Sequence, residues 1–214
     1  RLLLDNATLI DNASNYAMRI AASSDVSTEA AANVSVTNGL LFGGAVTFNN
    51  GANIELLTDV ALSATWTFSD NSTINCHGHV LDFSSGGISI AAGKTLRLRN
   101  AVLKGLGVGT LTLSSSTSTL NLSDATVIMG ASLTYTTGKI VIDGPTTIAT
   151  GAYVLTRSGG SATLQVNAGI TLWYDTLGNF DNNNIVGSSG SGKVRPVLLD
   201  PNVGTVNYTN TLTD

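Results

Sequence analysis

The chain has 214 residues, of which 43% are hydrophobic and 11% are charged, and its formal net charge at pH 7 is −4. With only 10 Lys and Arg residues, the sequence offers no basic surface for nucleic acid. The apolar content is too high for a disordered chain, and no apolar run approaches the ~18 residues of a membrane-spanning helix. We therefore expect one folded domain over residues 1–214, with no nucleic-acid partner and no membrane insertion.

Pairs of apolar residues separated by one polar residue recur along the chain. This alternation predicts short β-strands with one buried face. The interior spacing of the pairs is roughly 20 to 24 residues, a repeat length typical of solenoids. In chain order the pairs are Leu2/Leu4, Val34/Val36, Ile54/Leu56, Ile74/Cys76, Leu96/Leu98, Leu120/Leu122, Ile140/Ile142, Leu164/Val166 and Val197/Leu199. The sequence therefore predicts an all-β solenoid of about nine coils.

Each pair is followed by a corner and a second apolar strand, and is preceded by a third strand. Asn100 and Asp124 occupy such corners, because Asn and Asp tolerate left-handed backbone and can bond their own chain. Residues 102–103 exemplify the second strand and residues 66–68 the third. We expect three short strands in each coil, stacked about 4.8 Å from the equivalent strands of the next coil.

Two intervals interrupt this period, residues 19–33 and residues 175–193. In the first, Ser27 or Thr28 precedes Glu29 and an alanine run, a pattern compatible with a short helical turn. The second is rich in turn-forming residues. Insertions in solenoids map to loops on one face, where binding often occurs, so we expect an excursion loop at each interval.

The segment INCHGHVLDFSSGGISIAAGKTLRLRNAVLKG, residues 74–105, resembles the coil pattern of parallel β-helix proteins of the pectin-lyase-like class. Those proteins carry a segment such as IDGNGHTLDL ahead of coils of the form G-x-T-L-x-L-x-N. Cys76 and His77 stand where that pattern more often has Gly and Asn. The resemblance implies a right-handed parallel β-helix.

The same resemblance leaves the function open, because fold does not determine function in this class. It includes polysaccharide lyases and hydrolases, phage tailspikes, adhesin passenger domains and repetitive surface proteins. This chain is most similar to the non-catalytic members that form surfaces or filaments.

Cys76, His77 and His79 form the one cluster of metal-ligand types in the sequence. A zinc site needs about four such ligands, and the chain contains no other Cys or His. The alternation of residues predicts that Cys76 points into the core and that His77 lies at a turn. We expect no metal and no cofactor.

Catalytic constellations are not evident in the sequence. Glycoside hydrolysis requires paired carboxylates, whereas Asp59, Asp82, Asp124 and Asp143 are scattered over corners and strands. Lyases of the class, by the same resemblance, use Arg or Lys with calcium-binding Asp clusters. Arg97 and Arg99 would be the nearest analogue, but no acidic cluster accompanies them, and Arg97 is expected to lie on the outer face beside Glu55 and Asn75.

The two ends of the chain resemble each other. RLLLD at residues 1–5 is similar to RPVLLD at residues 195–200. Solenoid ends without caps expose unpaired backbone, and a head-to-tail contact that does not close generates a filament. We expect an assembly interface that includes Leu2, Leu4, Leu9, Val197, Leu199, Val203 and Tyr208.

These observations lead to three hypotheses for function. The first is a non-enzymatic structural subunit of an extracellular filament or surface layer, with further copies of itself as partner. The second is an adhesin-type solenoid domain that binds a glycan or a host protein through its excursion loops. The third is a polysaccharide lyase or hydrolase, which the missing constellations make the weakest.

Composition and the start of the chain suggest where the protein works. Low charge with abundant Thr, Ser, Asn and Gly is typical of secreted and surface β-proteins. The sequence begins at Arg1 without Met, so we expect a processed product or an excerpt of a longer chain. Cys76 is the single cysteine, which excludes an intrachain disulfide.

Overall fold

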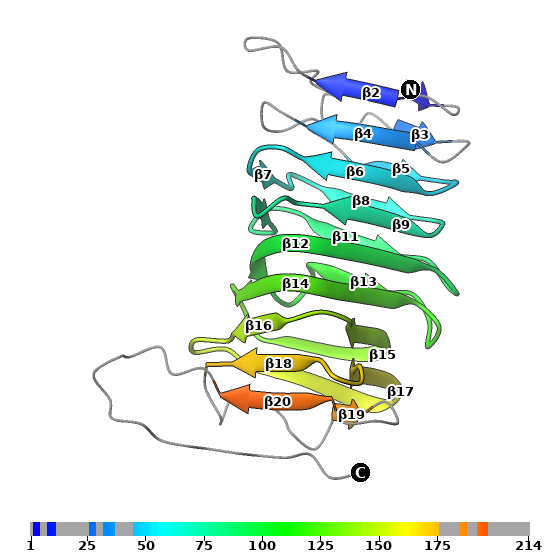
Figure 1. The fold of residues 1–214 in the computed structure, drawn as a ribbon. Coiled ribbons are helices and arrows are strands. Elements are labelled where there is room, and N and C mark those ends of the chain that lie inside the picture. The colour runs from blue at the N-terminus through cyan, green and yellow to red at the C-terminus, as the bar shows by residue number, and fades with distance from the viewer. Residues whose placement is uncertain are drawn as a thin grey trace.

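The computed structural model describes residues 2–4, 8–11, 26–28, 32–36, 45–175, 185–187 and 192–196, with side chains described for residues 45–175 and 192–195. These residues form strands and turns without any helix. The strands stack in parallel along one axis, so the fold is all-β and is a parallel β-solenoid (Figure 1). The predicted fold class and the resemblance to parallel β-helix proteins are confirmed at this level.

The strands in chain order are β1 (Leu2–Leu4), β2 (Thr8–Asp11), β3 (Val26–Thr28), β4 (Ala32–Val36), β5 (Val46–Phe48), β6 (Ala52–Leu56), β7 (Val60–Ala61), β8 (Thr65–Phe68), β9 (Ser72–Asn75), β10 (Val80–Asp82), β11 (Gly87–Ile90), β12 (Thr95–Leu106), β13 (Leu111–Leu113), β14 (Thr119–Met129), β15 (Leu133–Ile142), β16 (Thr146–Ala149), β17 (Leu155–Val166), β18 (Thr171–Tyr174), β19 (Ile185–Gly187) and β20 (Lys193–Pro196).

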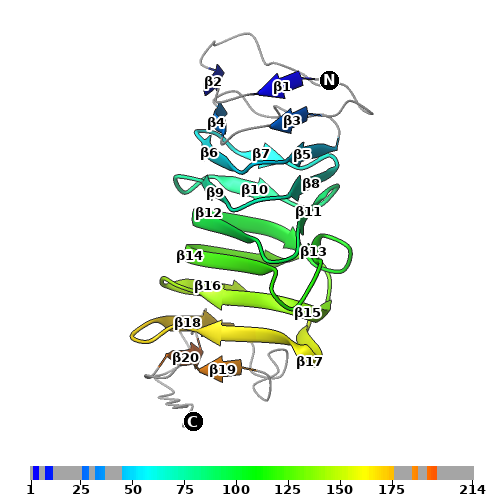
Figure 2. The ribbon, with the colours of Figure 1, turned by 90° about the vertical axis from the view of Figure 1, so that its right-hand side faces the viewer.

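Two parallel sheets enclose the core. The smaller has six strands in the order β1-β3-β5-β8-β11-β13, and the larger has 14 strands. The larger sheet has two arms. The first arm follows the order β19-β17-β15-β14-β12-β9-β6-β4-β2, and the second arm stacks β7, β10, β16, β18 and β20 with the later parts of β12 and β14. Figure 2 shows the successive turns stacked from one end to the other.

The number of turns is lower than predicted. Within the described residues, about six turns, rather than the nine predicted, place a strand in both sheets, although the first arm itself stacks nine strands. The difference arises where β15 and β17 run continuously around a corner. Residues 133–135 pair with residues 155–157, and after a shift residues 137–142 pair with residues 161–166. The third side of these coils therefore merges into the larger sheet.

The strand register also differs from the sequence alignment at β9 and β12. Leu98 lies beside Ile74, and Leu96 lies beside Ser72, whereas the sequence predicted that Ile74 matches Leu96. A slip of two residues keeps the same face inward, because side chains alternate with a period of two. The corner at residues 76–79 is longer than the corner at residues 100–101, and the alignment did not place this insertion.

The strand assignments near the two ends of the chain differ most from those predicted. Leu2 and Leu4 belong to β1 of the smaller sheet, and Leu9 of β2 is the residue that lies beside Val34. Assigning Leu2/Leu4 to the column of Val34 was therefore wrong. Strands also lie inside both intervals expected as excursion loops, β3 in residues 19–33 and β19 in residues 175–193. Ser27 and Thr28, considered as the residues that precede a short helical turn, belong to β3, and residues 29–31, where that turn would begin, lie outside the described residues.

The core consists of stacked apolar columns between the sheets. Phe48 lies beside Phe68 in register, and their rings stack with centroids 5.0 Å apart and an interplanar angle of 12°. Trp66 contacts Phe48 edge-on, with centroids 6.0 Å apart. Burying aromatic rings of this size stabilises each turn against its neighbours. Cys76 is fully buried in the same core, as predicted.

Candidate functional site

Three successive turns change direction at residues with a left-handed backbone. His77, Asn100 and Asp124 have φ values of 50°, 48° and 53°. They mark the corner between the first and second arms, since strand pairing of the first arm ends just before them and pairing of the second arm follows. A left-handed conformation disfavours residues other than glycine by roughly 1–2 kcal/mol, although Asn and Asp tolerate it best. Polar side chains thus occupy a position where glycine would have the least backbone strain.

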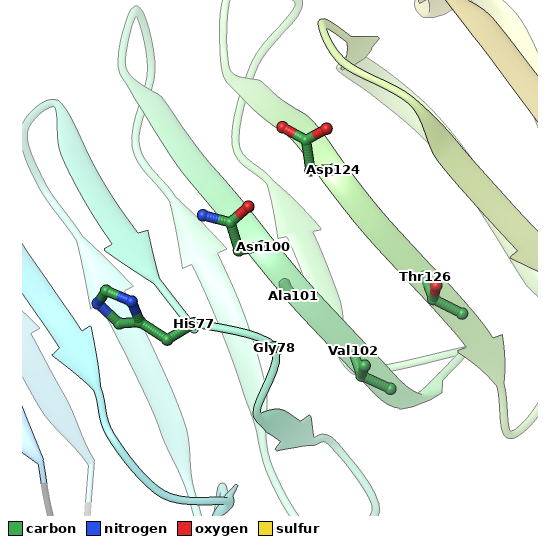
Figure 3. Close-up of a pocket in the computed structure, with 7 residues that line it drawn as sticks. All are labelled: His77, Gly78, Asn100, Ala101, Val102, Asp124 and Thr126. Carbon is green, nitrogen blue, oxygen red and sulfur yellow. The ribbon is translucent and has the colours of Figure 1, made fainter.

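These residues line a shallow concavity of about 460 Å³ on the outside of the corner. The remaining lining residues are Gly78, Ala101, Val102 and Thr126. Figure 3 shows His77, Asn100 and Asp124 in one row across neighbouring turns, with Val102 and Thr126 projecting from the second arm. We call this concavity the corner groove.

Hydrogen bonds to the first arm hold the row of polar side chains. The His77 Nε2 atom contacts Glu55 Oε2 of the preceding turn and lies 3.1 Å from Asn75 Nδ2. Asn100 Nδ2 donates to Asn75 Oδ1 at 3.1 Å, and Ser123 Oγ donates to Asp124 Oδ2 at 3.0 Å. The side chains of His77 and Asn100 are therefore positioned by the preceding turn, and that of Asp124 by its own strand.

Part of each polar group is left without a protein partner. Among the described residues, Asn100 Oδ1 and Asp124 Oδ1 accept no hydrogen bond. The row thus offers acceptors in consecutive turns.

The second histidine forms a similar contact across turns. His79 Nδ1 lies 3.4 Å from Asp59 Oδ1, which also accepts a hydrogen bond from the Val80 amide at 2.9 Å. The described residues contain no group of three or more His, Cys, Asp or Glu residues that could hold a metal ion. Burial, followed by the negative charge of Glu55, raises the pKa of Cys76 to about 12, so its thiol stays protonated at neutral pH.

The two arginines do not lie where the sequence predicted. Arg97 lies beside Thr73 and Asn121, so its predicted position next to Glu55 and Asn75 was wrong. Arg99 occupies the row of Asn75 because of the two-residue register shift. Both arginines are exposed on the outer face of the first arm, and neither side chain makes a hydrogen bond or ion pair with the described residues.

The predicted assembly residues are only partly within the described chain. Leu2 and Leu4 lie in β1, and Leu9 lies in β2. Val197, Leu199, Val203 and Tyr208 lie outside the described residues. In the described part of the chain, β2 pairs only with β4, β19 only with β17, and β20 only with β18.

Comparison with protein-family models, with curated proteins and with solved structures found no match. The part of the chain that the structure describes has no helix with the length and apolarity needed to cross a membrane. Function must therefore be inferred from the residues and geometry of this chain.

Proposed function

We propose that this chain is a non-enzymatic structural subunit that assembles head to tail with further copies of itself. The observation that carries the proposal is that the larger sheet ends, within the described residues, in strands with a single neighbour. β2 forms one such edge and β19 the other. Unpaired edge strands present backbone donors and acceptors that readily pair with another chain.

Strand direction favours this mode of contact. All neighbouring strands of the first arm are parallel. A copy shifted along the solenoid axis would therefore bring its β2 edge against the β19 edge with the same strand direction. A contact of this kind is heterologous and does not close, so repeated addition would give a filament.

The first arm is the better candidate for the contact. β19 has the sequence IVG and β2 has the sequence TLID, both short and weakly charged. β20 in the second arm instead carries Lys193, Arg195 and Pro196. Lys and Pro are residues that natural sheets use to block edge pairing. We therefore place the proposed contact between β19 and β2.

Cross-turn contacts of the charged groups support a structural role. Lys94 Nζ lies 2.7 Å from Asp70 Oδ1, and Lys104 Nζ lies 3.1 Å from Asp82 Oδ2. These pairs join successive turns on the outer surface. Exposed pairs of this kind contribute little stability individually, but they place opposite charges on neighbouring turns in register. The extracellular or surface location remains part of the proposal and is supported by the low charge of the sequence.

The proposal is tested by blocking one edge at a time. Proline at Val186 of β19 or at Ile10 of β2 removes a backbone donor from an edge strand, where proline is best tolerated. Sedimentation velocity should show concentration-dependent assembly of the wild-type protein. Each blocked variant should stop growth at one end, so small amounts of it added to wild type should shorten the assemblies.

Val108→Ser is the matched control, because Val108 is exposed and lies in a turn between β12 and β13, far along the chain from both edges. It should leave assembly unchanged. Thermal unfolding of every variant identifies any that fail to fold. If wild type is monomeric at all concentrations, or if folded Val186→Pro and Ile10→Pro proteins do not shorten its assemblies, the proposal is wrong.

A further inference from the structure

We propose that Asn50 is a site of spontaneous self-modification, at which the backbone nitrogen of Gly51 displaces the side-chain nitrogen of Asn50 and an aspartyl or isoaspartyl residue results. Asn50 and Gly51 lie in the turn that joins β5 to β6 (Figure 1). Neither residue belongs to an edge strand of the proposed assembly contact. The modification is therefore independent of the proposed function.

The reaction needs no partner other than water. The Gly51 nitrogen forms a bond to Cγ of Asn50 and loses its proton, and the side-chain amide nitrogen leaves as ammonia. The product is a cyclic succinimide. Water then adds to either carbonyl carbon of this ring and breaks the bond from that carbon to the ring nitrogen, which gives aspartate or isoaspartate. No group is oxidised or reduced.

The structure leaves both reacting groups free. Asn50 is exposed in the turn, and its side chain makes no hydrogen bond with the described residues. The Gly51 amide likewise donates no hydrogen bond within this part of the chain. Glycine also has no Cβ atom to obstruct the approach of its nitrogen to Cγ. The reaction therefore does not have to wait for an existing bond to break.

The next turn shows the same corner with its amide held. The corner has equal length in both turns, because the strands on its two sides keep one offset of 20 residues. Asn50 and Gly51 therefore lie beside Asp70 and Asn71. Asp70 Oδ1 accepts a hydrogen bond from the Asn71 amide at 2.7 Å. The equivalent amide in the earlier turn, that of Gly51, has no such acceptor.

Other asparagines of the described chain offer an internal comparison. Asn71 Oδ1 accepts a hydrogen bond from the Thr95 amide at 2.8 Å. Four more have hydrogen-bonded side chains, and none of the five is followed by glycine: Asn75, Asn100, Asn121 and Asn167 are these four. The Asn-Gly dipeptide occurs once more, at residues 38–39, which lie outside the described residues.

The fold itself requires the glycine. Gly51 has a φ of +89°, and a Cβ atom there would lie 2.5 Å from the backbone oxygen of Asn71. Another residue would be strained in this conformation and would also clash with the next turn. The reactive dipeptide is thus kept at this corner by packing between turns.

The modification changes the charge of the corner. A carboxylate at residue 50 would lie about one turn spacing, ~4.8 Å, from the position of Asp70. Lys94 Nζ is already paired with Asp70 Oδ1 at 2.7 Å, so the new charge would add repulsion at this corner. Isoaspartate also lengthens the backbone just where Gly51 packs against Asn71. We expect the isoaspartyl form to unfold at a lower temperature than Asn50→Asp, which has the charge alone.

The experiment is peptide mapping by mass spectrometry after incubation of the folded 214-residue chain in mildly alkaline buffer made with oxygen-labelled water. A urea-unfolded sample is incubated alongside. Digestion with chymotrypsin in ordinary water cuts at Phe42 and Phe48, so Asn38 and Asn50 fall on different peptides and only products formed before digestion carry the label.

Asn50 of the folded chain should gain one labelled oxygen at a rate within about tenfold of its rate in urea, because no local opening has to precede the reaction. The rate should rise with pH, since the attacking nitrogen must lose its proton. Asn71 should keep its amide in the folded chain. Asn50→Gln is the matched control, because it keeps an amide but requires a larger and slower ring closure, and it should stay unmodified.

A folded chain in which Asn50 keeps its amide, or reacts more slowly than this limit while the urea sample converts, would overturn the proposal. Equal conversion of Asn50 and Asn71 in the folded chain would also overturn it, because the free corner would then confer no selectivity. Thermal unfolding of the incubated protein verifies that it is still folded when the rates are compared.

Discussion

The close approach of Gly138 to Leu113 gives a sharp test of how the solenoid turns its corners. Gly138 lies in β15, just after the register shift, and has a φ of +84°. A Cβ atom at this position would lie 2.4 Å from Leu113 Cβ and 2.7 Å from Leu113 Cδ1. Leu113 is 5% exposed and belongs to the core. Gly138→Ala must therefore displace Leu113 or the backbone.

Gly169 provides a control with the same conformation and no clash. Its φ is +76°, and a Cβ atom there would meet nothing within 4 Å. Gly169→Ala isolates the cost of a left-handed alanine, about 1–2 kcal/mol. Gly138→Ala adds the cost of overpacking a core, typically about 1–3 kcal/mol. We expect Gly138→Ala to lower the free energy of unfolding by at least about 1 kcal/mol more than Gly169→Ala.

Urea unfolding followed by far-ultraviolet circular dichroism measures both differences. The comparison requires that the denaturant slope be unchanged, so that the two variants unfold from equivalent states. If the two alanine variants lose the same stability, then Gly138 does not approach Leu113 as closely as described. The corner within β15 would then pack against β13 in a different way.

Three further predictions address the corner, the thiol and a carboxylate. Asn100→Ala should be about 1 kcal/mol less stable than Asn100→Gly in thermal unfolding, and equal stability would contradict the left-handed corner. Cys76 should not react with a thiol reagent at pH 8 until urea is added, whereas a fast native reaction would show that it is exposed. Burial raises the pKa of Asp175, but hydrogen bonds from the Gly151 and Thr150 amides and the Thr150 hydroxyl outweigh it and lower the pKa overall. Because its pKa is lower in the folded state, the ionised Asp175 carboxylate stabilises that state at pH values above its unfolded pKa of about 4, and this stabilisation is lost as the pH falls through the folded-state pKa. Asp175→Asn should therefore reduce the loss of stability between about pH 5 and pH 2. An unchanged acid profile in urea unfolding would contradict this.

The fold class was predictable because both physical signals of a β-solenoid are local. Alternation with a period of two identifies the strands, and their recurrence identifies the stacking. Alternation cannot fix the register, since Ile74 against Leu96 and Ile74 against Leu98 both keep apolar side chains inward. The structure selects the second pairing, and Arg97 is consequently one row away from its predicted neighbours.

The corner groove was not predicted, although the sequence pattern identifies two of the residues that line it. Asn100 and Asp124 follow the alternating pairs at equivalent positions, and the sequence identified both as corner residues. It could not show that consecutive corners align into a row, because the longer corner at His77 hides the equivalence. Nor could it show that Ala101 and Gly78 leave space beside that row. Concavity depends on the angle between two arms, which no local pattern encodes.

End-to-end assembly is tested most directly by electron microscopy of the purified 214-residue chain over a range of concentrations, combined with fibre diffraction of aligned samples. We predict unbranched filaments whose strand spacing of about 4.8 Å lies along the filament axis, because each copy continues the stack of the one before it. Single particles at every concentration, or filaments with the strand spacing across the axis, would contradict assembly through the solenoid ends.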